Sequence, residues 1–541
     1  MQKNKAKEPR LIVGVIILMI SNIIVKVIGV LFKIPLHDLL GDRGMSYFNI
    51  AYNLFTTLYL VSTAGLPTAI SMMVSEARVK GKKAEVRRIF RTAVCLFFIL
   101  GTIGTSIMLF GAGGLAKLMG SADASWAIMA ISPTLFLICI SSSIRGYFQG
   151  HQNMFPTACS EIIESAGKFI LGIVLGTWAV RTGKSIEICA AYAIAGVAIG
   201  EACGLVFLIC AKFLHKQDYS YTLAEDDGTV SSSKKILKNL LLISVPVMLS
   251  SVALNLTSTI DTFTIINIIK RYSSAETAEA AYGNYTTLAV TLFHLPSAFI
   301  YPISTSLAPA LSAARAAENK IKERSVLSAS VKMTVIISIP CAIGMALMSK
   351  PILGLLFSNE ASVNSAAPLL SILSPAIFFS AILTVTSAAL QACHYQRKPI
   401  ISMVCGIVAK AVVSCALMSI KSIGILGAPI GTLVSYFVMA AVNFMFVLKY
   451  VSYVSSEINI FKLIIKPIVA SGLASILTLT SYNAIYRAGH PTVGTVISIV
   501  LTVFAYFIFL FVLKEFNRDD IMIFPHGEKI YKALVKMHLM K

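Results

Sequence analysis

The chain carries few charged residues for its length, and acidic residues are the scarcer kind. Only 13% of its 541 residues are Asp, Glu, Lys or Arg, whereas 56% are hydrophobic, and the mean hydropathy is +0.80. Soluble globular proteins contain a smaller share of hydrophobic residues and a larger share of charged ones. The low charge therefore excludes an ordinary soluble protein and indicates a membrane protein.

The sequence also lacks the spacings that enzymes and metal proteins use. Its ten cysteines form no CxxC pair and have no histidine at metal-ligand spacing, and no Ser-His-Asp, HExxH or paired-carboxylate arrangement stands out. The segment "RTGKS" at 181–185 ends like a phosphate-binding loop, but Trp178 stands where that loop needs glycine. We therefore expect no enzyme activity, no metal and no cofactor.

Alternation of apolar and polar residues with a period of two, which a membrane β-barrel requires, is absent as well. Apolar runs of 18 or more residues recur instead, and about 20 residues of helix span a bilayer core of roughly 30 Å. The sequence predicts an all-α polytopic membrane protein with about fourteen transmembrane helices. The predicted spans are 11–36, 46–75, 92–112, 126–148, 155–179, 186–211, 237–268, 283–309, 325–348, 366–392, 399–420, 425–448, 463–486 and 492–513.

The formal net charge of +21 could indicate a nucleic-acid partner, so the placement of the basic residues matters. Most of them fall in alternate loops, and the densest cluster is "ARVKGKKAEVRRIFR" at 77–91. The positive-inside rule explains this asymmetry if both termini are cytoplasmic. We therefore expect no nucleic acid. The start of the chain resembles a signal peptide, but without a cleavage site it is predicted to be the first span.

A long polar interruption at 214–235 divides the chain. We predict an N-terminal lobe of six spans at 1–213, a cytoplasmic linker at 214–235, a C-terminal lobe of six spans at 236–450, and two further spans with a cytoplasmic tail at 451–541. A weak repeat supports the two lobes, because three residues recur 242 positions later. These are Ser132, Pro133 and Gln149, which recur as Ser374, Pro375 and Gln391. Repeated lobes are a known transporter plan with the substrate site between them.

Basic residues inside the spans are the main candidates for a site. A Lys or Arg near the bilayer centre costs about 2.5 to 3.5 kcal/mol, so depth decides which of them need an explanation. Lys26, Lys168 and Lys410 are predicted to be deep, and Lys168 and Lys410 are again 242 residues apart. Their repetition predicts a central cationic cavity that receives an anion. Lys410 has no acidic residue in its own predicted span.

Polar neighbours of two of these lysines follow helical spacing. Asn22, Lys26 and Lys33 make one stripe on the first span, and snorkelling to the membrane surface explains Lys33 equally well. Glu161, Glu164 and Lys168 make another stripe on the fifth span. A purely structural alternative is that Lys168 pairs with Glu164 or Glu161 on its own helix, and that Lys26 snorkels or bonds to a neighbouring helix.

The segment "SIRGYFQGHQNMFP" at 143–156 ends the fourth predicted span. Arg145 lies about one turn before its cytoplasmic end, so we expect its side chain to reach lipid phosphate. Gln149 then belongs to a tight turn beside an interfacial aromatic anchor. Composition and spacing alone predict no more than this interfacial motif.

The same words carry a family resemblance. "RGYFQGHQNMFP", followed by "SEIIES" and Lys168, resembles the polysaccharide biosynthesis and stage V sporulation protein B group of the multidrug/oligosaccharidyl-lipid/polysaccharide (MOP) exporter superfamily. The similarity extends along nearly the whole chain, including 62–81 and 294–319, and more loosely to lipid II flippases. Where that group often has arginine on the fifth span, this chain has Lys168. The resemblance implies a cationic central cavity, with Lys26 at a position where flippases carry a basic residue, and a groove for an isoprenoid tail at spans 13 and 14.

These observations together predict a flippase of the bacterial inner membrane. Its expected substrate is an anionic polyprenyl-pyrophosphate-linked sugar, such as the lipid II peptidoglycan precursor or a related oligosaccharide, with membrane lipids as its surroundings and a coupling ion or the membrane potential as the driving force. One alternative is a cation-coupled multidrug exporter of the same superfamily, for which Asp261 and Glu161 would be the acidic residues. Another is a scaffold for wall synthesis, which leaves the deep cations unexplained.

Overall fold

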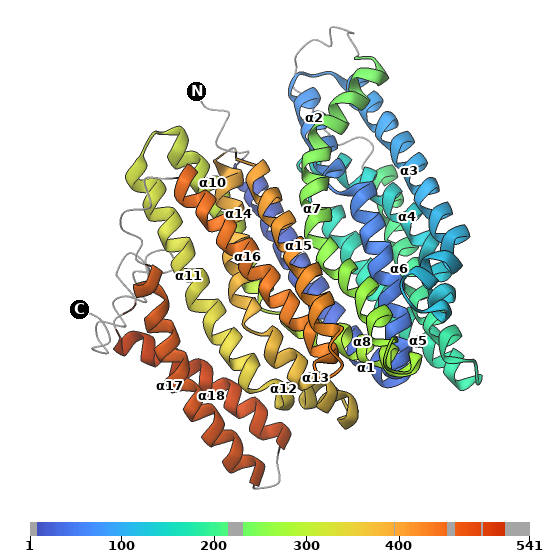
Figure 1. Ribbon diagram of the computed structural model, residues 1–541. Coiled ribbons are helices and arrows are strands. Elements are labelled where there is room, and N and C mark those ends of the chain that lie inside the picture. The colour runs from blue at the N-terminus through green and yellow to red at the C-terminus, as the bar shows by residue number, and fades with distance from the viewer. Residues whose placement is uncertain are drawn as a thin grey trace. The chain divides into compact units, whose positions relative to one another are not determined.

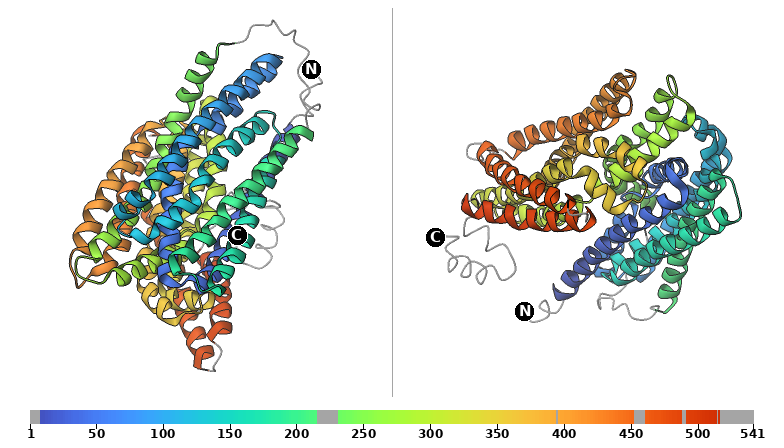
Figure 2. Two further views of the ribbon diagram at one scale, coloured as in Figure 1. Left: turned by 90° about the vertical axis from the view of Figure 1, so that its right-hand side faces the viewer. Right: turned by 90° about the horizontal axis from the view of Figure 1, so that it is seen from below.

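A computed structural model describes residues 8–214, 231–393, 395–451, 460–487, 491–513 and 515. These residues form helices joined by short turns, and the described part of the chain contains no strand. The chain divides into two compact units, residues 1–287 and 288–541, and each is treated by itself below. Figure 1 labels the helices, and Figure 2 gives two further views.

The described residues of the first unit form eight α-helices. They are α1 (Glu8–Thr63), α2 (Leu66–Val79), α3 (Lys83–Leu118), α4 (Ser125–Gly150), α5 (Phe155–Arg181), α6 (Ile186–Leu214), α7 (Ser233–Ile269) and α8 (Ala275–Asn284), with the short turn η1 (Ala122–Ala124) before α4 and the helical turn η2 (Tyr285–Ala289) after α8, at the boundary of the units. Helix α4 packs against α2, α3 and α6, and α5 packs against α1 and α6. Helix α1 also contacts α7 and α8.

Helix α1 covers two of the predicted spans without a loop between them. Its continuity is interrupted at Gly41, where φ is 64° and ψ is −178°. Residues that carry a Cβ atom rarely adopt these dihedral angles, whereas glycine adopts them readily. Gly41 therefore allows the break. The two helical parts on either side of Gly41 correspond to the spans predicted at 11–36 and 46–75, the second of which continues into α2.

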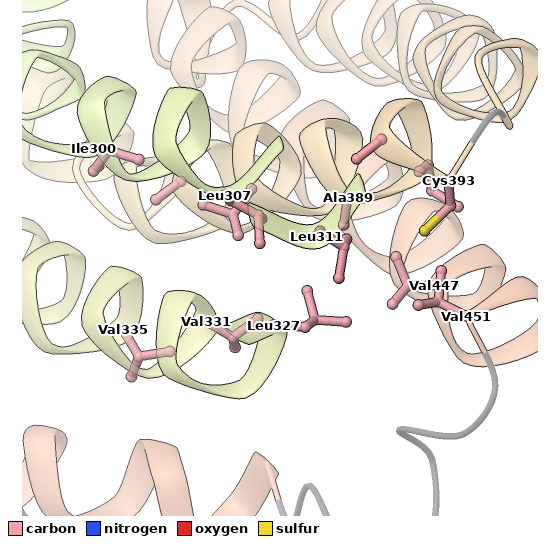
Figure 3. Packing of buried hydrophobic residues seen from close by; sticks show 14 of the residues in the cluster. Ile300, Leu307, Leu311, Leu327, Val331, Val335, Ala389, Cys393, Val447 and Val451 are labelled. Carbon is pink, nitrogen blue, oxygen red and sulfur yellow. The ribbon is translucent and has the colours of Figure 1, made fainter. Parts of the chain in front are cut away.

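In the second unit, ten α-helices are formed by the residues that the structure describes. They are α9 (Val290–Phe293), α10 (Ser297–Ala316), α11 (Lys320–Leu347), α12 (Ser349–Leu356), α13 (Glu360–Leu373), α14 (Ala376–Ala392), α15 (Arg397–Met418), α16 (Gly427–Tyr450), α17 (Ile460–Arg487) and α18 (Pro491–Val512), with the turn η3 (Gly424–Leu426) before α16. Its core lies where α10, α11, α14 and α16 meet, and Figure 3 shows Leu311, Leu327, Ala389 and Val447 there. Close packing of this kind is what holds helices together in lipid.

The last two helices are attached to α11 by apolar and polar contacts. Buried Tyr506 on α18 donates a hydrogen bond from its hydroxyl to the carbonyl of Ile336 at 2.7 Å. The Glu515 carboxylate lies 3.8 Å from the Lys332 ammonium on α11 and 3.4 Å from that of Lys466 on α17. Lys332, for which membrane-surface snorkelling is a natural sequence interpretation, is therefore held inside the protein.

Nine helices among the described residues are long and apolar enough to cross a membrane, and two bent helix pairs bring the number to eleven. The bent pairs are 275–312, which turns by 49°, and 360–392, which turns by 47° beside Pro375. The three other predicted spans lie on α1 and α5, which are helical there. The predicted fold class, an all-α polytopic membrane protein, is confirmed.

The predicted lobes and the compact units are divided at different points. Helices α7 and α8 belong to the first unit, although they follow the polar interruption at 214–235. Most of that predicted linker, and the predicted cytoplasmic tail after 515, lie outside the described residues. The lobe boundaries and the cytoplasmic location of both termini stay predictions.

Candidate functional site

Glycines set the geometry of the candidate site by bringing α5 and α6 into backbone contact. A Cβ atom added to Gly200 on α6 would lie 2.7 Å from the backbone nitrogen of Lys168 and 2.7 Å from the carbonyl oxygen of Glu164. One added to Gly196 would lie 2.3 Å from the backbone nitrogen of Gly172. Small residues at such crossings let two helices approach closely in a membrane. The charged residues of α5 and α6 are therefore fixed relative to one another.

Arg145 lies in a buried ion pair instead of at the membrane surface. Its side chain donates from Nη2 to the Glu164 carboxylate at 3.0 Å and from Nε to the Ser160 hydroxyl at 3.1 Å. The residue is only 8% exposed. The arginine expected to anchor to lipid phosphate thus joins α4 to α5. Charge-assisted bonds of this kind are among the stronger ones in proteins.

Lys168 is not paired with a carboxylate, since none of the described residues forms an ion pair with it. Its ammonium nitrogen lies 5.8 Å from the centroids of both the Phe32 and Tyr52 rings of α1. Lys33 on α1 is close enough to Lys168 for the two charges to repel. The pairing of Lys168 with Glu164 or Glu161, considered from the spacing, does not form. Two cations and two aromatic rings meet at this point.

Lys26 and Asn22 lie further along α1, and both are exposed in the structure. Lys26 is seven residues from Lys33, or about 10 Å along a helix that rises 1.5 Å per residue. Glu161 is partly buried and also faces Arg145. Arg145, Glu161, Glu164 and Glu201 of α6 are together called the Arg145 cluster. The buried Ser21 hydroxyl donates to the carbonyl of Ala158 at 3.1 Å, which ties this part of α1 to α5.

Lys410, the remaining predicted cation, belongs to the second unit and is only 1% exposed. It lies on α15, which packs closely against α16: a Cβ at Gly406 would lie 2.8 Å from the carbonyl oxygen of Ser435. Its place in a shared cavity stays a prediction. Asp261, the acid considered for a drug exporter, is buried on α7 at 5% exposure.

Glu201 on α6 is a buried acid of this cluster that was not predicted from the sequence, because the prediction rested on the basic residues inside the spans. Glu201 is fully buried, and its charged neighbours are Glu164 and Arg145. A single glutamate directly after a glycine in the apolar run "AAYAIAGVAIGEACGLVF" at 190–207 is the signal that could have found it.

The motif around Arg145 has a second role in packing α4 against α2. A Cβ added to Gly146 would lie 2.9 Å from the carbonyl oxygen of Pro67, and one added to Gly150 would lie 2.6 Å from the Cβ of Val74. Gln149 between them is half-buried. The glycines of this motif are therefore required by helix contact, which the sequence interpretation as a tight turn did not foresee.

Replacing Gly150 with alanine tests this contact. We expect a loss of stability of about 1 to 3 kcal/mol, because the added methyl group must push α2 and α4 apart. Gly113→Ala on α3 is the matched control, since a Cβ there meets nothing within 4 Å. Thermal unfolding of the purified proteins measures both, and equal midpoints for the two variants would contradict the packing role.

His151, which follows α4, makes stability depend on pH. Burial lowers its pKa to about 4, and the positive charges of Arg78 and Lys212 contribute to that shift. The unfolded chain has a histidine pKa of about 6.5, so between these values it binds more protons than the folded protein. We expect stability to fall as the pH drops from about 6.5 to about 4. His151→Asn should weaken that slope in thermal unfolding, and an unchanged slope would contradict the assignment.

A polar network near the middle of α1, just after Gly41, was also missed by sequence reasoning. The Glu279 carboxylate of α8 accepts from Arg43 Nε at 2.9 Å, from the Tyr47 hydroxyl at 2.9 Å and from the Ser121 hydroxyl at 2.7 Å. These bonds connect α1 and the turn before η1 to α8. Such residues are scattered in sequence, so only the fold brings them together.

Uncharged polar side chains line the contact between α1 and α7. Asn53 on α1 donates to the Thr262 hydroxyl at 3.1 Å, and Asn255 on α7 donates to the Thr57 hydroxyl at 2.9 Å. Amide and hydroxyl groups of this kind hold helices together in lipid. They also give this side of α1 a polar surface, whereas Tyr52 lies toward Lys168.

The chain has recognisable relatives. A family model described as Polysaccharide biosynthesis protein matches residues 11–315, and another, MatE, matches residues 246–415. Three proteins of Bacillus subtilis (strain 168) are similar. The uncharacterized membrane protein YabM is 24% identical over 529 residues, covering 96% of each chain. Lipid II flippase MurJ is 23% identical over 510 residues, covering 91% of this chain and 93% of the relative. Stage V sporulation protein B is 29% identical over 302 residues, covering 55% and 57%.

The fold is also found among solved structures. That of lipid II flippase MurJ in an inward closed conformation matches with a TM-score of 0.70 at 16% identity, covering 92% of this chain and 99% of that one. Identity at this level establishes a shared fold, and a shared fold alone does not assign a substrate.

Proposed function

Because the chain belongs to the polysaccharide biosynthesis protein family, we propose that it is a flippase that carries a polyprenyl-pyrophosphate-linked sugar from the inner to the outer leaflet of the bacterial membrane. The family model covers residues 11–315, which is more than half of the chain. The resemblance to the MOP exporter superfamily is thereby confirmed. Under this proposal the substrate is the lipid II peptidoglycan precursor or a related lipid-linked oligosaccharide.

The observation that carries the proposal is the placement of Lys168. Its ammonium group has Lys33 and two aromatic rings beside it, while the nearby carboxylate of Glu164 is taken by Arg145. Positive charge at membrane depth is costly and marks binding sites for ions and substrates. A pyrophosphate, with about two negative charges, would offset that cost and serve as the ligand.

Each residue then has a proposed role. Lys168 and Lys33 bind the pyrophosphate. Lys26 and Asn22 line its path along α1. Glu161 and Glu164 interact with Arg145 on α4 and thereby position α5, which carries Lys168. Gln149, next to the Arg145 cluster, acts in packing. Lys410 is proposed as a further cation for the same anion. Helices α17 and α18 are proposed to bind the isoprenoid tail, as the family resemblance implies.

The transport cycle is proposed to be alternating access, in which the site opens first to one leaflet and then to the other. No covalent bond is made or broken. A membrane potential supplies roughly 2.3 kcal/mol per elementary charge per 100 mV. Outward passage of a pyrophosphate with about two charges would thus gain about 4 to 5 kcal/mol per 100 mV if it crosses the full field uncompensated. Potential alone would bias export.

A multidrug exporter of the same superfamily is the less favoured function. The MatE model matches residues 246–415, but a carrier of cationic drugs needs a free carboxylate at its site. Glu164 is instead paired with Arg145, and Glu161, one of the acids considered for that role, faces the same guanidinium. Proton-dependent efflux of cationic dyes by the purified protein would favour this function over the flippase.

Complementation tests the proposed substrate. Expression in a bacterial strain depleted of its own lipid II flippase is expected to restore growth. Failure to restore growth at normal membrane abundance would rule out lipid II as the substrate. Transport of another polyprenyl-pyrophosphate-linked sugar by the purified protein would then retain the proposed class with a different sugar.

A further inference from the structure

Glu201 is a buried acid whose carboxylate oxygens make no well-formed hydrogen bond with the described residues, although Glu164 and Ser141 lie beside them. The side chain is 0% exposed, and it lies in the middle of α6, one of the helices that can cross a membrane. An ionised carboxylate in such a place loses its hydration and has only a share of the Arg145 charge in return. Buried polar groups are nearly always bonded, so this exception calls for an explanation.

The charged and titratable groups that face Glu201 come from three helices. Helix α5 contributes Glu164, α4 contributes Arg145 and Cys139, and α1 contributes the Tyr59 hydroxyl. The guanidinium of Arg145 is bonded to Glu164 at 3.0 Å and also faces Glu161. One guanidinium therefore serves three carboxylates, and carboxylates that share a site do not all ionise.

A hydroxyl group beside Glu201 also lacks a well-formed hydrogen bond within the described part of the chain. Ser141 on α4 lies beside the Glu201 carboxylate, but its hydroxyl makes no well-formed hydrogen bond with the residues described. A carboxylic acid can donate one hydrogen bond and accept others, whereas a carboxylate can only accept. A proton on Glu201 would let its side chain donate to the neighbouring Glu164 carboxylate, which can only accept.

We propose that Glu201 is a proton-binding site, protonated in this conformation, and that its proton is coupled to anion binding at Lys168. The proton is taken from and returned to water, and no other bond changes. The coupling rests on the proposed function, because it needs an anion at Lys168, whereas the bound proton does not. Under this proposal, Glu201 links transport to protons, although it belongs to no recognised sequence motif.

The coupling follows from the geometry of α5 and α6. Glu164 and Lys168 lie one helical turn apart on α5, the contact at Gly200 holds the backbone of α6 against this turn, and the Glu201 side chain neighbours that of Glu164. An anion at Lys168 therefore adds negative charge one helical turn from Glu164, whose carboxylate neighbours Glu201. That charge opposes ionisation of Glu201, so anion binding favours the proton. Coupling is reciprocal, and protons must therefore strengthen anion binding by the same factor.

Infrared difference spectroscopy tests the proton directly. The purified protein is expected to show the carbonyl band of a protonated carboxylic acid at neutral pH, and to lose it at alkaline pH. Glu201→Gln should remove this band, and Glu187→Gln, on the same helix but away from the cluster, should retain it. A wild-type spectrum equal to that of Glu201→Gln at every pH would overturn the proposal, and so would a band that never titrates.

Binding of farnesyl pyrophosphate tests the coupling. If one proton is taken up per anion, wild-type affinity is expected to weaken by up to about tenfold per pH unit once Glu201 ionises. Glu201→Gln should bind without that contribution, while Glu187→Gln should behave as the wild type. Identical pH dependence in wild type and Glu201→Gln would overturn the coupling. Absence of binding in every variant would contradict the anion site at Lys168, while the infrared result would still decide the proton site.

Discussion

Replacing Lys168 with alanine is expected to abolish flipping of a lipid-linked sugar while the protein stays folded. The ammonium group makes no ion pair with a described residue, so its removal leaves no buried carboxylate without a partner. The expected loss is in the affinity for the anionic substrate. A hydrogen bond to a charged group contributes about 1.5 to 3 kcal/mol, or roughly 10- to 150-fold in affinity.

Conservative and distant variants complete this test. Lys168→Arg keeps the charge and should retain part of the activity, although a planar guanidinium and a compact ammonium bind phosphate differently. Lys184→Ala, in the exposed turn after α5, should behave as the wild type. Initial flipping rates at matched membrane abundance measure all three. Full activity of Lys168→Ala would exclude this lysine from the substrate site.

Arg145→Ala is expected to have the largest effect on stability. The arginine lies in the middle of the buried cluster, and its loss leaves the Glu164 carboxylate without its cation. Removing one partner of a buried ion pair costs about 3 to 5 kcal/mol. We expect low membrane abundance and a large fall in the thermal unfolding midpoint of any protein that is recovered.

A second substitution separates the ion pair from simple loss of packing. Arg145→Ala combined with Glu164→Gln should recover part of the lost stability, because the uncompensated charge is gone. Arg181→Ala, at the exposed end of α5, provides the control. If Arg145→Ala unfolds at the wild-type temperature, the guanidinium is at the membrane surface, as its sequence position suggests, and not in the cluster.

The fold was largely predictable because apolar runs of sufficient length must form helices in a membrane. Each predicted span lies on one helix or on consecutive helices with a short break, and the break in α1 is marked by Gly41. The Ser-Pro repeat was less informative. Pro133 lies inside α4, whereas Pro375 begins α14 after a sharp bend, so equal residues have different local structures. Neighbouring helices decide between the two.

The candidate site was predictable only in part. Helical spacing correctly put Glu164 and Lys168 on one helix, but it favoured partners on that helix, whereas the partner of Glu164 is Arg145 on α4. Depth along a span likewise suggested a surface position for Arg145. Burial depends on which helices approach, and the glycine contacts that determine this link α5 to α6 and α4 to α2. Such contacts join segments that are distant in sequence.

Translocation by the purified protein is the central claim, and reconstituted vesicles test it most directly. Vesicles containing the protein and a fluorescent polyprenyl-pyrophosphate-linked sugar are treated with a quencher that reaches only the outer leaflet. The wild-type protein is expected to expose the lipid of both leaflets to the quencher, faster under an imposed potential, and Lys168→Ala is expected to leave the inner leaflet protected. Protection of the inner leaflet with the wild-type protein, or equal exposure with both proteins, would contradict the account.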